Sequence, residues 1–180
     1  MCMAKTRSVG AHNSQRAQKG ANMFVRMSGV VDQQATIEQW PVLNLLNGTS
    51  VSLAQTTFRN NYGYAVDLTA DPKATITASE FISNGGGVRV SNCKLAVVGS
   101  MFMNNVQNAI EIVRGGVLSV SSSSFVSNRV GIQTYTGSTK AVVKLWNVTF
   151  ASNKHVGFFC RVGRQSDTTT ARTEFRSYTC

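Results

Sequence analysis

One short motif, Phe-x-x-Asn, returns five times in this 180-residue chain and constrains its fold more than any other feature. The five copies begin at Phe58, Phe81, Phe102, Phe125 and Phe150 and end at Asn61, Asn84, Asn105, Asn128 and Asn153. A sixth copy begins at Phe175 but has lost its asparagine. Successive phenylalanines are 23, 21, 23, 25 and 25 residues apart. A period this regular indicates a chain built from repeated structural units.

Apolar rows with the same period predict what each unit contains. Five residues before each phenylalanine stand Leu53, Ile76, Val97, Val120 and Leu145, and seven before stand Val51, Ala74, Leu95, Leu118 and Val143. Two rows offset by two residues indicate a β-strand whose alternate side chains point inward. A second alternating pair follows each asparagine: Val66 and Leu68, Val88 and Val90, Ile110 and Ile112, Ile132 and Thr134, and Val156 and Phe158, with Leu43 and Leu45 in the first coil.

These rows predict an all-β fold, a right-handed parallel β-helix. It is a single-stranded solenoid of about five to six coils of 21–25 residues. Coils that stack about 4.8 Å apart should bring the phenylalanines into an interior column and the asparagines into an amide ladder. The solenoid is expected over residues 37–180, with a degenerate last coil, as a fragment of a longer solenoid. Residues 1–36 show no repeat and are predicted to be a basic segment that is disordered or poorly ordered.

The net charge is +10, and five basic residues with no acid stand in the first thirty: Lys5, Arg7, Arg16, Lys19 and Arg26. A basic chain can favour anionic partners, although a solvated basic tail is the plainer interpretation. The sequence contains no nucleic-acid-binding motif and no basic stripe interleaved with aromatic residues. We therefore expect no specific nucleic-acid partner.

The four cysteines, Cys2, Cys93, Cys160 and Cys180, form no CxxC pair and are widely spaced. This pattern favours neither a zinc site nor a disulfide framework. The chain has no run of eighteen apolar residues, so we expect no transmembrane helix. Its start lacks the continuous apolar stretch of a signal peptide. The expected protein is a monomer without a metal or cofactor.

The Phe-x-x-Asn repeats, together with glycine-small-hydrophobe segments such as Gly86-Gly87-Val88, resemble the polymorphic outer membrane protein repeats of chlamydiae. Broadly similar repeats occur in β-helix proteins of the pectin-lyase-like superfamily. The resemblance covers about residues 42–160. It implies a cell-surface or secreted passenger that acts in adhesion. We therefore predict a non-catalytic, adhesin-like module that presents flat polar sheets to a polysaccharide or a cell-surface protein, outside the cell or on its surface.

The predicted binding face is the outward row between the second pair of inward rows: Asn44, Asp67, Arg89, Glu111, Gln133 and Gly157. A second outward row, Ser52, Thr75, Ala96, Ser119 and Lys144, offers another contact surface. Because these positions alternate with inward residues, both rows should face solvent.

The first row also carries the catalytic candidates Asp67, Arg89 and Glu111. Two coils separate the two acids, which gives about 9.6 Å and lies at the upper edge of the carboxylate separation in inverting glycosidases. The resemblance to the pectin-lyase-like superfamily gives the alternative function, a polysaccharide lyase or glycoside hydrolase, whole or truncated. In a lyase, Arg89 would act as the base between acidic calcium ligands, and only then is calcium expected.

The structural interpretation of the same row is an ordinary charge ladder. Acid, arginine and acid on neighbouring strands are what charge pairing produces on any exposed sheet face. A central arginine also favours the charged form of a carboxylate, the wrong direction for a general acid. Arg89→Ala should abolish turnover in an enzyme but change binding only modestly in a scaffold. Of the remaining candidates, His155 is interpreted as a surface or turn residue, and the run from Ser121 to Ser124 as a turn with hydroxyl ladders.

Overall fold

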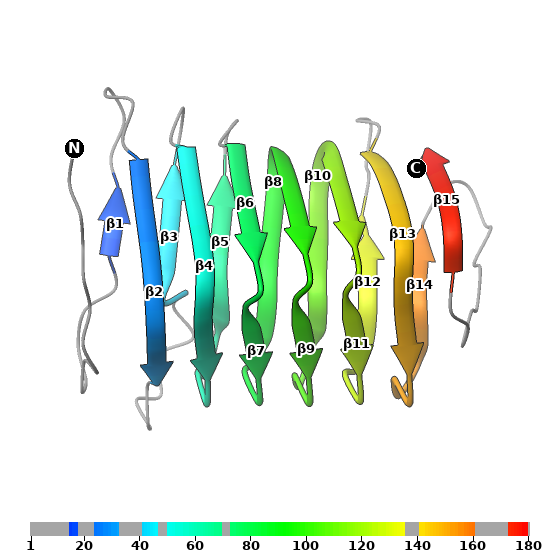
Figure 1. Ribbon diagram of the computed structural model, residues 1–180, viewed down its shortest axis with the longest axis horizontal. Coiled ribbons are helices and arrows are strands. Elements are labelled where there is room, and N and C mark those ends of the chain that lie inside the picture. The colour runs from blue at the N-terminus through cyan, green and yellow to red at the C-terminus, as the bar shows by residue number, and fades with distance from the viewer. Residues whose placement is uncertain are drawn as a thin grey trace.

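The computed structural model describes residues 15–17, 24–32, 41–46, 50–69, 73–135, 141–160 and 173–179. These residues form strands that wind into a solenoid of about five turns, without a helix in the described part (Figure 1). The strands are β1 (Gln15–Ala17), β2 (Phe24–Asp32), β3 (Leu43–Leu46), β4 (Ser50–Arg59), β5 (Tyr64–Thr69), β6 (Lys73–Thr77), β7 (Glu80–Ile82), β8 (Gly86–Val98), β9 (Met101–Met103), β10 (Asn108–Ser121), β11 (Ser124–Val126), β12 (Val130–Thr134), β13 (Ala141–Ala151), β14 (Val156–Cys160) and β15 (Thr173–Thr179). The predicted all-β parallel β-helix is confirmed.

Each coil contributes to three parallel ladders. The first ladder joins β1, β3, β5, the start of β8, the start of β10, β12 and β14. The second joins β2, β4, β6, the ends of β8 and β10, and β13, while the third runs through β4, β7, β9, β11 and β13. In Figure 1 the first ladder forms the rear layer, and the other two run down the front. The two layers enclose the apolar core.

The interior phenylalanines form the expected column. Phe58, Phe81, Phe102 and Phe125 are fully buried, and Phe150 is nearly so. Neighbouring ring centroids lie 5.1, 4.6, 4.9 and 5.1 Å apart along the column, so the rings stack in order. Each buried ring stabilises the fold by roughly 1.5–3 kcal/mol of apolar transfer free energy. The column therefore supplies a large part of the hydrophobic core.

The motif asparagines form the expected amide ladder, which Asn105 illustrates. Its Nδ2 donates to Asn128 Oδ1 at 2.8 Å and to the Phe81 carbonyl at 3.0 Å. Its Oδ1 accepts from the backbone N of Asn84 at 3.0 Å and from Asn84 Nδ2 at 3.1 Å. Buried amides need such partners, because an unpaired buried polar group is costly. The motif therefore uses asparagine for a self-satisfying ladder inside the turn.

The left-handed turn position lies one residue before each ladder asparagine. The φ angles there are +57° at Asn60, +54° at Ser83, +56° at Asn104, +55° at Ser127 and +53° at Ser152. The left-handed conformation therefore falls on the residue before the motif asparagine, whose side chain is used for hydrogen bonding.

Serine and threonine side chains form a hydroxyl ladder. It lies just before the short strands β7, β9 and β11, at the opposite end from the asparagine ladder. The backbone N of Ser100 donates to Ser123 Oγ at 3.1 Å, and Ser123 Oγ donates to the Ser121 carbonyl at 2.8 Å. Ser79 makes the equivalent bonds one coil earlier. The interpretation of the serine run as a turn with hydroxyl ladders is therefore confirmed at Ser123.

Three sequence expectations need correction at the two ends. Strands β1 and β2 lie before residue 37 and pair in parallel with β3 and β4, so the ladders begin earlier than the predicted boundary. The rest of the segment 1–36 lies outside the described residues. Strand β15 is antiparallel to β13, and Phe175 pairs with Trp146 rather than Phe150, so it does not form a sixth parallel coil. Strand β14 is shifted by two residues from the expected register, because Ile132 pairs with Phe158.

Candidate functional site

The predicted binding row lies along the outer surface of the first ladder. Asn44, Asp67, Arg89, Glu111 and Gln133 occupy successive paired positions from β3 to β12, as their alternation predicted. The next position is Phe159 and not Gly157, because of the two-residue shift in β14. The row therefore ends on a half-buried aromatic side chain.

Two adjacent members of the row, Asp67 and Arg89, form an ion pair. Asp67 is buried, with 5% of its surface exposed, and its Oδ2 accepts hydrogen bonds from Arg89 Nε at 3.1 Å and from a terminal nitrogen of the same guanidinium. Thr69 Oγ1 donates to the other carboxylate oxygen at 3.4 Å. The Arg89 guanidinium also lies 5.5 Å from the centre of the buried Tyr64 ring, a cation–π distance.

This closed cluster shifts two pKa values. The hydrogen bond to Asp67 raises the pKa of Arg89, which stays positively charged. Burial, followed by the nearby charge of Glu111, raises the pKa of Tyr64 above its usual range. The Tyr64 hydroxyl is buried, with the side chains of Glu111 and Asn108 close to it. Both groups are therefore held in one protonation state, which suits a structural role.

Beyond Arg89, the row borders a hollow of about 330 Å³ on the outer surface of β10, β12 and β14. We call it the outer hollow. Its lining residues are Gln107, Asn108, Glu111, Arg129, Val130, Gln133, Tyr135, His155, Val156 and Phe159. Two members of the predicted row, Glu111 and Gln133, thus lie in a shared depression, while Asp67 and Arg89 lie outside it.

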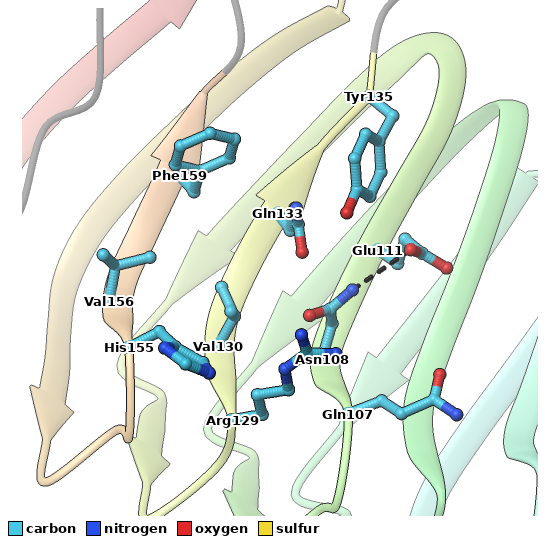
Figure 2. Close-up of a pocket in the computed structure, with 10 residues that line it drawn as sticks. All are labelled: Gln107, Asn108, Glu111, Arg129, Val130, Gln133, Tyr135, His155, Val156 and Phe159. Carbon is cyan, nitrogen blue, oxygen red and sulfur yellow. Dashed lines mark hydrogen bonds between the residues drawn. The ribbon is translucent and has the colours of Figure 1, made fainter.

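Figure 2 shows how these side chains are arranged around the outer hollow. Val130 and Val156 occupy equivalent positions on adjacent strands, and their short side chains leave room between the longer ones around them. The Tyr135 hydroxyl points into the space between Gln133 and Glu111. Glu111 is half-buried and accepts a hydrogen bond from Asn108 Nδ2 at 3.1 Å.

Two turn residues, Arg129 and His155, line one side of the outer hollow. Arg129 and His155 precede β12 and β14, are exposed, and lie side by side in Figure 2. The His155 backbone N donates to the Arg129 carbonyl at 2.9 Å, which fixes the two turns against each other. The exposed turn position of His155 agrees with its interpretation as a surface or turn residue.

Sequence reasoning missed most of the outer hollow. Asn108, Arg129 and His155 lie outside the strict alternation that identified the row, and Phe159 was displaced by the register error. Asn108 and Arg129 stand two and three residues before the inward pair of their coils, and His155 stands three residues before Phe158, the partner of Ile132. Within the part of the chain described, no three His, Cys, Asp or Glu side chains gather as a candidate metal site. The same part contains no helix long and apolar enough to cross a membrane.

Comparison with protein families gives one match. The model of the right-handed β-helix region matches residues 41–155. The match includes all five complete Phe-x-x-Asn motifs and most of the outer hollow. Separate comparisons with curated proteins and with solved structures gave no significant match.

Proposed function

The chain belongs to the right-handed β-helix family, and from that premise we propose that it is a non-catalytic binding module that holds a glycan chain in the outer hollow. The observation that carries the proposal is the combination of side chains there: amides, a carboxylate, a guanidinium, an imidazole and rings around a floor with short aliphatic residues. Binding sites for small organic groups commonly combine apolar contact with a few convergent polar groups.

The chemistry of the outer hollow matches that of a sugar. Sugar rings present hydroxyls at their edges and C–H groups on their faces. The amides of Gln107, Asn108 and Gln133 donate and accept hydrogen bonds, and Glu111 accepts them. Tyr135, with 39% of its surface exposed, and the half-buried Phe159 offer ring surfaces for the C–H faces. The outer hollow is open to solvent, so a ligand larger than one sugar can extend out of it.

The alternative function, a polysaccharide lyase or glycoside hydrolase of the pectin-lyase-like superfamily, is favoured by one observation. Glu111, Arg129 and His155 line one hollow, so an acid, a cation and a titratable imidazole surround the same space. The pair Asp67 and Glu111 gives little support to a two-carboxylate mechanism, because Asp67 is buried and bonded to Arg89. Calcium enters only with the lyase alternative.

The proposed setting is the cell surface or the extracellular space, where the protein acts in adhesion as a monomer. The resemblance of the Phe-x-x-Asn repeats to chlamydial surface repeats supports this part of the proposal. A cell-surface protein is the second partner class that the same polar face suits, whereas specific nucleic-acid binding is not proposed.

A glycan array followed by titration tests the proposal. Wild-type protein should bind a defined subset of glycans, and Tyr135→Ala should weaken that binding at least about tenfold, the equivalent of about 1.4 kcal/mol. Tyr62→Ala is the matched control, because Tyr62 is 57% exposed and does not line the outer hollow. Absence of glycan binding, or equal losses in both variants, would refute the proposal. Release of unsaturated products or new reducing ends from a bound polysaccharide would establish the enzyme instead.

A further inference from the structure

A second surface, on the opposite layer from the outer hollow, carries two exposed lysines on adjacent strands and a third two coils further on. It is the outer side of the second ladder, formed by β4, β6, the end of β8, the end of β10 and the start of β13. We call it the lysine face. Its outward residues are Ser50, Lys73, Lys94, Val117 and Val142 in one row, Ser52, Thr75, Ala96, Ser119 and Lys144 in the next, and Ala54, Thr77, Val98, Ser121 and Trp146 in the third.

Of the acidic side chains that the structure describes, none lies beside the lysines of this face. Lys73 and Lys94 are both exposed and stand directly opposite each other on adjacent strands. Like charges at such positions are destabilising. Neither makes an ion pair with another residue of the described part. Lys144 adds a third exposed cation two coils beyond Lys94.

The acidic side chains that the structure describes all lie elsewhere. Asp67 and Glu111 belong to the first ladder, on the opposite layer. Glu80 belongs to β7 in the third ladder, where it accepts a hydrogen bond from Thr57 at 3.3 Å. Asp67, Glu111 and Glu80 therefore do not neutralise the exposed lysines of this face, and exposed cations favour an anionic partner.

The shape of the lysine face is suited to an extended partner. Its middle row begins with the small side chains of Ser52, Thr75, Ala96 and Ser119, so no bulky side chain separates the coils there. Strands in this ladder follow one another at about 4.8 Å, which places Lys73 and Lys94 at that spacing along the solenoid axis. A linear polyanion lying along the axis would meet cations on successive coils and hydroxyl groups beside them.

We propose that the lysine face binds an anionic polysaccharide, carrying sulfate or carboxylate groups, along the solenoid axis. The serine and threonine hydroxyls of the middle row match sugar hydroxyls in hydrogen-bonding chemistry. Single-stranded nucleic acid is bound by successive aromatic rings, whereas the described part of this face presents one, Trp146. The proposal concerns a different surface from the outer hollow and does not depend on the function proposed there.

Binding of the 180-residue chain to immobilised dextran sulfate and polygalacturonate, over a series of salt concentrations, tests this proposal. Lys73→Gln/Lys94→Gln should weaken binding to at least one of them about tenfold or more at low salt. It should also reduce the slope of log affinity against log salt by roughly 1.4–1.8, because two fewer counterions are released. The five basic residues near the N-terminus are the same in every variant and contribute equally.

Two single variants decide where the polyanion binds. Lys154→Gln removes an exposed cation that belongs to neither surface, and its affinity should stay within about twofold of the wild type. An equal loss in Lys154→Gln would mean that net charge alone drives binding, which overturns the proposal. A loss confined to Arg129→Gln would move the polyanion to the outer hollow, which also overturns it while leaving the proposed function intact.

The probe class is tested in the same experiment. Tighter binding to an oligothymidine, or to phosphatidylserine vesicles, than to either polysaccharide would overturn the assignment to an anionic polysaccharide. Thermal unfolding of each variant, monitored by circular dichroism, shows whether the fold is kept. Because Lys73, Lys94 and Lys154 are exposed, the melting temperatures of these variants should stay close to that of the wild type.

Discussion

Replacing Phe102 by alanine tests the stacked core at its centre. The ring is fully buried between Phe81 and Phe125, with centroids at 4.6 and 4.9 Å. A Phe→Ala change in a core costs about 3–5 kcal/mol. The upper part of that range applies here, because the parallel ladders fix Phe81 and Phe125 on either side and prevent the cavity from closing. At roughly 2–4 °C per kcal/mol for a chain of this size, the melting temperature should fall by about 8–20 °C.

Thermal and urea unfolding followed by circular dichroism measure this loss. Val106→Ala is the matched control, since Val106 lies four residues further along the chain and is 68% exposed. Its unfolding free energy should change by less than about 0.5 kcal/mol. A loss below about 1 kcal/mol in Phe102→Ala would show that the ring does not stand in a packed column and would refute the register of the solenoid.

Two further predictions concern the buried polar groups. Asn105→Ala should lower the free energy of unfolding in urea by at least about 3 kcal/mol, because it removes four hydrogen bonds and leaves buried partners unpaired. Its control is Asn104→Ala at the exposed neighbouring position, which should lower it by only about 1–2 kcal/mol because alanine is strained in left-handed backbone. Since burial raises the pKa of Tyr64 above its unfolded value, the wild type should lose stability as the pH rises above about 10, and Tyr64→Phe should lose less in urea titrations over that range.

The fold could be predicted from the sequence because parallel stacking repeats the same residue type at the same place. A phenylalanine in each coil packs on the phenylalanine of the next coil, and each asparagine bonds to the next asparagine. Residues that stack in space therefore recur at a regular spacing in the sequence. The outward row from Asn44 to Gln133 followed from the same period together with strand alternation.

The register of β14 could not be obtained from alternation. A slip of one residue turns every inward side chain outward, but a slip of two keeps the inward and outward sets unchanged. Val156, Phe158 and Cys160 all belong to one set, so alternation fits either register. The distance from the ladder asparagine decides between them, because the paired inward residue comes four or five positions after it in the other coils, and Phe158 comes five after Asn153.

The outer hollow could not be predicted because it depends on the shapes of neighbouring side chains rather than on a period. Its residues come from three coils, and several belong to turns whose sequences are not repeated. Arg129 and His155 become neighbours only because their turns are hydrogen-bonded to each other. Charge alternation along the row directed attention to Asp67 and Arg89, which bind each other instead of facing an open site.

This pairing changes which substitution can report on function. Arg89→Ala separates an enzyme from a scaffold only if Arg89 is free to contact the ligand, yet its guanidinium is bonded to the buried Asp67. Removing the arginine leaves a buried carboxylate without its cation, which destabilises the fold whatever the protein does. A loss of binding or turnover in that variant would therefore identify no ligand contact. Glu111 is the next member of the same row, but it lines the outer hollow. A substitution that tests for a catalytic acid should therefore be made at Glu111 and not at Arg89.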